Sequence, residues 1–152
     1  MQQIEPPAPR PCDSCPYRRD CPSGVWAESE YRKLAQYDAP TGYQPLKVFQ
    51  CHQLDRQAPR TRVCAGWAGC HDGDELAALR IAVRKGLMTA QVAEAVRDYV
   101  SPVPLFLSGA QAAEHGLAQL AHPGPQAAEA IAKIERVRSD LPDRDTPAKA
   151  PR

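Results

Sequence analysis

Several features that identify familiar classes of protein are missing from this sequence. Its 152 residues contain no apolar run near the roughly 18–20 residues of a membrane span. The first residues, MQQIEPPAPR, lack the basic and then apolar order of a secretory signal, which predicts a cytoplasmic location. There is no Gly-rich phosphate loop, no serine-nucleophile elbow and no zinc-protease helix motif. These absences leave enzymatic activity open and favour a role without catalysis.

A strong net charge of either sign is also missing. The formal net charge is +1, with 24% of the residues charged and 43% hydrophobic. This balance provides no bulk attraction to nucleic acid or to an anionic membrane, so binding to DNA would need a local patch. Arginines near the cysteines could form such a patch on the protein, or could simply offset thiolate charge. They are Arg18, Arg19, Arg56, Arg60 and Arg62.

Cysteine and tryptophan do not occur after residue 72. All six cysteines, both tryptophans and four of the five tyrosines precede this point, and an Ala-rich sequence follows it. A chain of this length supports one domain with a modest core. We predict a disordered lead-in over 1–10, a single metal-binding domain over 11–141 with a cysteine-rich part (11–72) and a helical part (73–141), and a disordered tail over 142–152.

Apolar residues at helical spacing predict three or four helices in the helical part. Thr89 and Ser108 have the positions of N-caps, Gly86 ends the first helix, and Pro125 begins the last. The prolines of SPVPLFL interrupt helix between them. In the cysteine-rich part, AESEYRKLAQY predicts a short helix and PLKVFQCH a short strand. The predicted fold is mainly α, with a loop-rich, cysteine-containing N-terminal half that wraps a metal site and packs on a C-terminal bundle of three to four helices.

The cysteines predict the site. Cys12 and Cys15 are separated by two residues, a spacing that forms a tight turn and brings two sulfurs to one ion while backbone amides point at them. In a reducing cytosol, clustered cysteines favour metal ligands or catalytic thiols over disulfides. A redox pair usually follows a strand, and nothing before Cys12 resembles one. Cys51 and Cys64 complete the simplest four-thiolate set. The possible alternate ligands are Cys21, Cys70, His52 and His71.

The scattered positions of the ligands favour a [4Fe–4S] cluster, with Zn²⁺ as the alternative. Zinc sites usually combine two short cysteine pairs, whereas Cys51 and Cys64 are each isolated in the sequence rather than forming a second short pair. Proline next to a ligand cysteine is a feature of cluster motifs. Trp26 and Trp67 would shield such a cluster from water and oxygen.

Two resemblances extend this interpretation. The stretch CDSCPYRRDC followed by Gly-Val-Trp resembles the Cys-x2-Cys-Pro-Val-Arg-x2-Cys and Gly-Val-Trp elements of the WhiB-like iron–sulfur regulators, which hold a [4Fe–4S] cluster and bind a sigma factor. The local resemblance implies a cluster and contact with the transcription machinery. In this sequence Tyr17 replaces the valine, and no cysteine precedes Cys12.

The second resemblance covers roughly residues 11–137. PCDSCPYRRDCPSGVW, YDAPTG, FQCH, CAGWAGCH and PVPLFLSGAQAAEHGLAQL together resemble an uncharacterised family of small cysteine-rich actinobacterial and actinophage proteins. In that family the recurrent cysteines correspond to Cys12, Cys15, Cys51 and Cys64. The resemblance implies the same four-thiolate set and makes Cys21 a doubtful ligand.

The predicted function is therefore a small cytoplasmic metal-binding protein. A [4Fe–4S] regulator or adaptor that acts through protein or DNA contact is the leading hypothesis. A zinc-stabilised structural or interaction module and a redox or metal-dependent enzyme are the alternatives. Since the ligands come from segments about fifty residues apart, metal binding and folding would be coupled.

Overall fold

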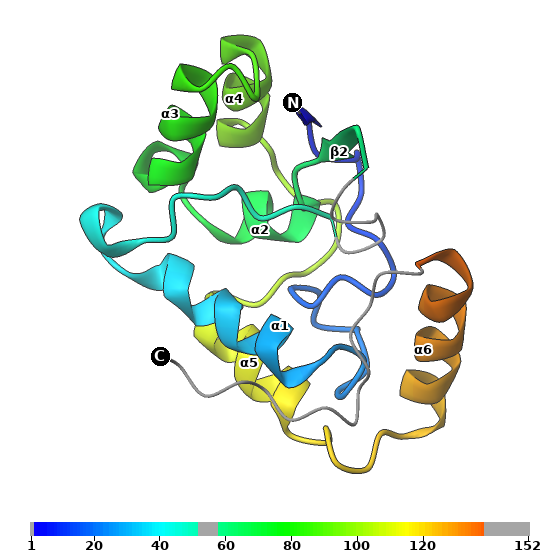
Figure 1. The fold of residues 1–152 in the computed structure, drawn as a ribbon. Coiled ribbons are helices and arrows are strands. Elements are labelled where there is room, and N and C mark those ends of the chain that lie inside the picture. Colours follow the sequence, from blue (N-terminus) through cyan, green and yellow to red (C-terminus); the bar gives the residue numbers. More distant parts are fainter. Residues whose placement is uncertain (1, 52–57, 139–152) are drawn as a thin grey trace.

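The computed structural model describes residues 2–51 and 58–138 and is mainly helical (Figure 1). Its α-helices are α1 (Glu28–Leu34), α2 (Ala65–Cys70), α3 (Ala77–Arg84), α4 (Ala90–Arg97), α5 (Gly109–Leu117) and α6 (Pro125–Val137). The strands are β1 (Gln3–Glu5) and β2 (Arg60–Arg62), and the 3₁₀ turns are η1 (Ala35–Asp38), η2 (Thr41–Tyr43) and η3 (Gly73–Glu75). No helix in these two ranges is both long and apolar enough to cross a membrane.

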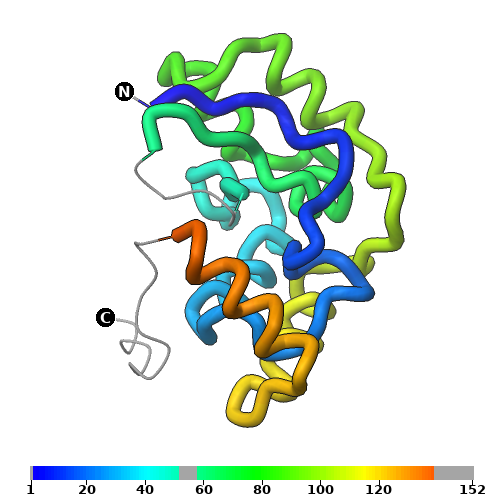
Figure 2. The backbone as a smooth tube through the Cα atoms, turned by 90° about the vertical axis from the view of Figure 1, so that its right-hand side faces the viewer, coloured from blue at the N-terminus to red at the C-terminus, as the bar shows by residue number. Residues whose placement is uncertain are grey.

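The N-terminal segment is part of the folded structure rather than a disordered lead-in. Strand β1 pairs in parallel with β2, so that Ile4 lies opposite Thr61. The Ile4 side chain is buried, and its backbone N–H donates to the carbonyl of Leu87 at 2.9 Å. Figure 2 shows the first residues running beside the segment that contains β2. The prolines of this segment led to a prediction of disorder, whereas the buried side chain of Ile4 anchors the segment to the fold. The tail over 142–152 lies outside the described residues.

Local signals placed four of the helix ends correctly in the second half of the chain. The Thr89 hydroxyl accepts a hydrogen bond from the Val92 N–H at 3.1 Å, and the Ser108 hydroxyl accepts one from the Gln111 N–H at 3.1 Å. Gly86 follows α3 with a φ of 73°, a conformation that favours glycine. Pro125 is the first residue of α6. These predictions are confirmed because each depends on chemistry within one turn of the chain.

The predictions for the cysteine-rich half are confirmed in part. The segment AESEYRKLAQY forms α1 and η1, and buries Tyr31 and Leu34. The segment PLKVFQCH forms no regular strand in its described residues, and only Gln50 makes an isolated bridge, with Val63. Val48 and Phe49 are nevertheless buried, as the apolar pattern indicates.

The C-terminal helices of the described chain do not form one bundle. Helix α3 packs against α4, whereas α5 packs against α1 and η1 from the cysteine-rich half. Helix α6 lies to one side of both pairs in the view of Figure 1. The two halves are therefore interleaved, and this corrects the expectation of a helical bundle behind a metal-binding half.

Small residues permit the close approach of α5 to α1. A Cβ on Gly116 would collide with the ring of Tyr31, and a Cβ on Gly109 would collide with the Leu34 carbonyl. Asp38 fixes the same junction, because its carboxylate accepts hydrogen bonds from the Gly109 and Ala110 N–H groups, both at 2.8 Å. The contact between the halves depends on backbone proximity as well as on side-chain burial.

We therefore expect Gly116→Ala to destabilise the protein by about 1–3 kcal/mol, because the added methyl group overpacks the Tyr31 contact. Urea unfolding followed by circular dichroism measures this change. Gly42→Ala is the matched control, since a Cβ there meets nothing within 4 Å, and its effect should stay within about 0.5 kcal/mol. Equal stability of the two variants would contradict the packing of α5 on α1.

Candidate functional site

The segment from Cys12 to Cys21 is a series of tight turns. The Cys15 N–H donates to the Cys12 carbonyl at 2.9 Å, and the Arg18 N–H donates to the Cys15 carbonyl at 3.0 Å. The Cys21 N–H continues the series to the Arg18 carbonyl at 3.2 Å. The Tyr17 N–H lies within hydrogen-bonding reach of the Cys15 sulfur. This is the arrangement of backbone amides around sulfur that the two-residue spacing predicted.

Folding brings the sulfurs of all four predicted ligands into contact in pairs. The Cys15 and Cys64 Sγ atoms are 3.8 Å apart. Cys12 lies within hydrogen-bonding reach of both Cys15 and Cys51. We call Cys12, Cys15, Cys51 and Cys64 the thiol cluster. Its order of contact is Cys51, Cys12, Cys15 and Cys64, across segments that are far apart in the sequence.

Two backbone hydrogen bonds position the distant members of the thiol cluster. The Cys51 N–H donates to the Arg62 carbonyl at 3.0 Å, and the Cys64 N–H donates to the Phe49 carbonyl at 2.8 Å. Cys64 directly precedes α2. Gly66 in the first turn of α2 allows the approach, because a Cβ there would collide with the Cys15 sulfur. Glycine is required here by proximity rather than by its φ.

Two thiols of the cluster, Cys12 and Cys15, are hard to ionise because their pKa values are raised. The hydrogen bond with Cys15 is the largest influence on Cys12 and raises its pKa to about 11, with burial adding to the effect and Cys51 opposing it. For Cys15 the hydrogen bond from Cys12 lowers the pKa, but Cys64 and burial outweigh it and leave the pKa well above its usual range. Several thiolates at this place would need a bound positive charge.

The four sulfurs form a chain of contacts rather than a closed coordination shell. Within residues 2–51 and 58–138, no three His, Cys, Asp or Glu side chains are arranged as the ligands of one metal ion. The six described cysteines are free thiols. The convergence of sulfurs is therefore a property of the fold, whereas metal binding by them remains a prediction.

Arg18 holds the cysteine loop together from inside. Its side chain is buried and donates to both carboxylate oxygens of Asp20, each at 2.7 Å, and to the Pro11 carbonyl at 3.0 Å. It also forms an ion pair with Asp13 at 3.3 Å. The charge of Arg18 is used within the loop and is not exposed to a partner.

The other arginines of the predicted patch have different surroundings. Arg19 donates to the Leu105 carbonyl at 2.8 Å and lies over the Phe106 ring, 5.7 Å from its centroid. Arg60 is exposed and pairs with Glu5 at 3.4 Å, and Arg62 is half-buried in β2. Arg56 lies outside the described residues.

The described alternate ligands, Cys21, Cys70 and His71, have surroundings that differ from one another. Burial raises the pKa of Cys21 to about 12, and its sulfur has a contact of 3.7 Å with the Pro22 carbonyl. Burial, with help from Asp38, raises the pKa of Cys70 to about 12 as well. Burial lowers the pKa of His71, and its Nδ1 atom is 3.8 Å from Asp38. His52 lies outside the described residues.

Aromatic rings pack beside the thiol cluster in an arrangement that the sequence analysis missed. The ring of Tyr17 lies 5.8 Å from those of Phe49 and His71, and the ring of Tyr37 lies 5.4 Å from Trp67. Tyr17 Oη, Trp67 Nε1 and His71 Nε2 are buried without a hydrogen-bond partner among the described residues. The proximity of Tyr17 and Trp67 to cysteines in the sequence was the one available signal.

The tryptophans support the cysteine loop in different ways. Trp26 donates from Nε1 to the Ser14 carbonyl at 2.7 Å, whereas Trp67 is fully buried in α2, three residues after Cys64. The segment SPVPLFL also packs on the loop, because the Phe106 N–H donates to the Tyr17 carbonyl at 2.9 Å. The loop is thus enclosed from several directions.

The fold and the site define a small, mainly helical protein built around a buried loop of cysteines. The chain belongs to DUF6283, a family of unknown function, which matches residues 7–138. No curated protein and no solved structure matches the chain. The prediction of an uncharacterised family is confirmed, and the match extends from the cysteine loop to the end of α6.

The internal contacts of Arg18 predict a specific effect of Arg18→Lys. Lysine keeps the charge but loses the two-pronged contact with Asp20 and the bond to Pro11, so we expect a loss of about 1–3 kcal/mol in the free energy of unfolding. Denaturant unfolding at neutral pH measures it. Arg19→Lys, on the exposed neighbour, should change this energy by less than about 0.5 kcal/mol.

The contribution of the Arg18–Asp20 contact to the free energy of unfolding depends on pH. Hydrogen bonding to Arg18 lowers the pKa of Asp20 below its ordinary value of 3.8. The stabilisation is therefore present above that value and is lost as the pH falls through the lowered pKa. The difference between the wild type and Arg18→Lys should shrink in acid, and a difference that grows below pH about 4 would contradict this role.

Burial of Cys21 predicts that its thiol is unreactive in the folded protein. Because the pKa of this thiol is raised to about 12, alkylation by iodoacetamide at pH about 8 should be at least about a hundredfold slower than in urea. Mass spectrometry of the peptides that contain Cys21 measures both rates. Equal rates in buffer and in urea would show that the thiol is exposed.

Proposed function

We propose that the thiol cluster binds one metal ion and that Zn²⁺ fits it best. The observation that carries this proposal is the 3.8 Å separation of the Cys15 and Cys64 sulfurs. A tetrahedron with zinc–sulfur bonds of about 2.3 Å has edges of about 3.8 Å. Two of the four sulfurs therefore already have the spacing of ligands to one zinc ion.

The remaining thiols lie where they can complete the tetrahedron. Cys12 and Cys51 are the two partly exposed members of the cluster. Cys12 lies within hydrogen-bonding reach of Cys15, and Cys51 lies within hydrogen-bonding reach of Cys12. Turning these two side chains toward the pair would convert the chain of contacts into a shell. A divalent cation would also replace the thiol protons, whose removal is otherwise opposed by burial and by neighbouring sulfurs.

A [4Fe–4S] cluster is the second candidate. The WhiB-like stretch around Cys12, Cys15 and Cys21 and the prolines next to these cysteines favour it. The buried rings of Tyr17 and Trp67 would exclude water from such a cluster. A cubane binds each thiolate through a different iron, so its four sulfurs stand farther apart than around one ion. The contact of Cys15 with Cys64 is too close for that arrangement, and the loop would have to open to accept it.

The role that we propose for the metal is structural support of an interaction module. The four proposed ligands join the cysteine loop, the segment that ends at Cys51 and the start of α2, so metal binding would stabilise the fold as a whole. Contact with a protein partner, in the manner of a regulator or adaptor, fits the absence of catalytic motifs from the sequence. The free thiols suit a reducing cytoplasm. Actinobacterial and phage sources, and binding to transcription machinery or DNA, are parts of this proposal that rest on sequence resemblance.

The test is metal analysis of protein purified under anaerobic conditions, together with an absorption spectrum. We expect about one zinc ion per chain and a colourless protein. Iron and sulfide in equal amounts, with absorption near ~400 nm, would show that the site holds a [4Fe–4S] cluster in place of zinc. Protein that holds neither metal, and takes up none on reconstitution with zinc or with iron and sulfide, would overturn the proposal.

Cysteine variants identify the ligand set. We expect Cys15→Ala and Cys64→Ala to lose bound zinc, since they hold the central pair of sulfurs. Cys21→Ala and Cys70→Ala are the matched controls, because these buried thiols lie outside the thiol cluster. They should keep full metal content even where the lost side chain lowers stability by about 1 kcal/mol. Loss of zinc in a control with native circular dichroism would redefine the set.

A further inference from the structure

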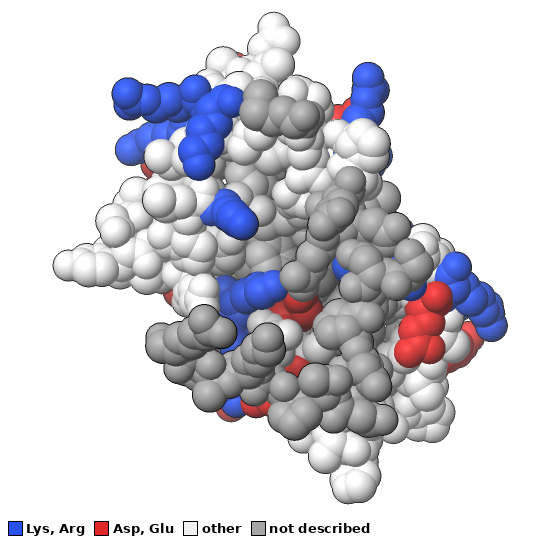
Figure 3. Space-filling view, viewed as in Figure 1, with Lys and Arg blue, Asp and Glu red and all other residues white. Residues whose placement is uncertain are grey.

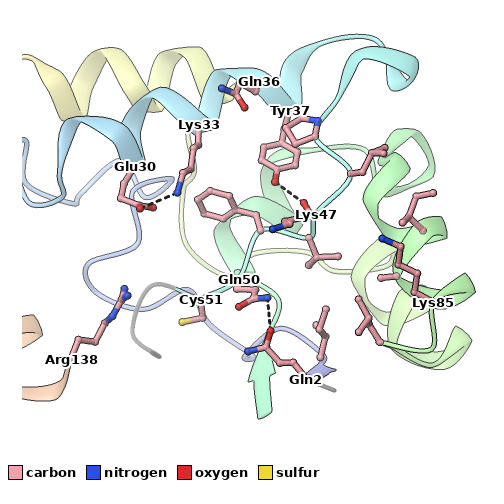
Figure 4. Close-up of a pocket in the computed structure, with 18 residues that line it drawn as sticks. Gln2, Glu30, Lys33, Gln36, Tyr37, Lys47, Gln50, Cys51, Lys85 and Arg138 are labelled. Carbon is pink, nitrogen blue, oxygen red and sulfur yellow. Dashed lines mark hydrogen bonds and ion pairs between the residues drawn. The ribbon is translucent and has the colours of Figure 1, made fainter. Parts of the chain in front are cut away.

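A cavity of about 640 Å³ opens beside the thiol cluster (Figure 4). Its walls come from α1, from the segment that ends at Cys51, from α3 and the turn after it, and from Arg138 at the end of α6. This volume lies within the roughly 300–1,000 Å³ typical of sites for small molecules. No sequence motif pointed to it, because its walls come from separate parts of the chain.

The cavity has a basic rim. Among the described residues, Lys33, Lys47, Lys85 and Arg138 line it together with one acidic residue, Glu30, which gives these side chains a formal charge of four minus one, or +3. Lys33 is paired with Glu30 at 3.1 Å. On the face seen in Figure 3, basic side chains also gather over α3 with few acidic ones between them.

Two of the rim lysines form no ion pair with another described residue. The side chains of Lys47 and Lys85 are exposed, and neither has a hydrogen bond or ion pair within the described ranges. Figure 4 shows them on the segment beside Tyr37 and at the end of α3. Uncompensated cations of this kind around one cavity attract an anion from solution.

The floor of the cavity is apolar. Ile4, Val48, Phe49 and Ala82 are buried core residues that also line it. Amide side chains add hydrogen-bonding groups, and Gln50 donates to Gln2 at 3.0 Å across one wall. An inorganic ion would leave this apolar floor uncovered, whereas an organic body would bury it.

We propose that this cavity binds a small organic anion, with an apolar or aromatic body against Val48 and Phe49 and a phosphate or carboxylate group at Lys47 and Lys85. The size of the cavity, its apolar floor and its uncompensated cations each point to this class of ligand. Phosphate and carboxylate share the chemistry that the lysines recognise.

The cavity also reaches the thiol cluster through Cys51, which belongs to both. A bound ligand would therefore cover one member of the proposed metal site. The inference does not rest on the metal, because the lysines and the apolar floor are separate from the thiols. Ligand binding and metal content can thus fail independently in experiments.

The first test uses the fluorescent dye anilinonaphthalene sulfonate, an aromatic anion, with the full chain as purified. We expect saturable binding to one site, and at least about tenfold weaker binding of the uncharged analogue N-phenylnaphthylamine. Absence of saturable dye binding, or equal affinity for the two dyes, would overturn the proposal. Displacement by adenosine monophosphate or by laurate then identifies phosphate on an aromatic body or carboxylate on an aliphatic one. Displacement by neither would also overturn it.

Charge reversal assigns the binding to this cavity. Lys47→Glu combined with Lys85→Glu should weaken dye binding at least about tenfold, since both lysines face the ligand. Lys133→Glu combined with Arg136→Glu is the matched control, because both residues are exposed on α6 and outside the cavity. Native circular dichroism of both double variants shows that they fold. An equal loss of binding in the control would show that the effect comes from the net charge of the protein, and it would contradict the proposed site.

Discussion

The contact between Cys15 and Cys64 is the constraint on which the rest of the structure depends. It joins a turn near the N-terminus to the start of α2 across 49 positions of sequence. A buried sulfur contact of this kind leaves no space for a side chain at Gly66, where a Cβ would meet the Cys15 sulfur. The tight turns of the loop and the position of α2 are therefore compatible only with each other, and the docked α2 buries Trp67.

The surrounding elements complete that junction from outside. Arg18 closes the loop on itself through Asp20 and the Pro11 carbonyl, so that an arginine beside the cysteines has a structural use. The segment SPVPLFL, whose prolines interrupt helix, returns to the loop, where its Phe106 N–H donates to the Tyr17 carbonyl. Helix α5 then reaches α1 through its glycines. The result is one interleaved core rather than a metal-binding half and a helical half.

The thiol cluster and the cavity meet at Cys51, and this relation suggests how the parts would work together. A metal ion at the thiols would fix the wall that contains Cys51, and an anion in the cavity would be drawn by Lys47 in the same segment and by Lys85 at the end of α3. The rings of Tyr17 and Tyr37 each pack edge-on against Phe49, which lines the cavity two residues before Cys51. Such an arrangement suits a protein that senses or presents a ligand, which is compatible with the role of a regulator or adaptor proposed above.

The sequence by itself determined four of the helix ends and the burial of central stripe residues such as Leu79, Val96 and Ile134, and it predicted the four cysteines that the fold brings near one another. Thr89, Ser108, Gly86 and Pro125 act within a single turn, so their chemistry can be read without knowledge of the fold. Only the tertiary structure decided that Ile4 anchors the N-terminus in a sheet, that Arg18 is internal, and that the helices pair across the two halves. The tertiary structure also creates the cavity that Lys47 and Lys85 line. These features depend on which distant segments approach each other, and that is set by the close fit of small residues such as Gly66 and Gly116 against specific partners, which no local pattern encodes.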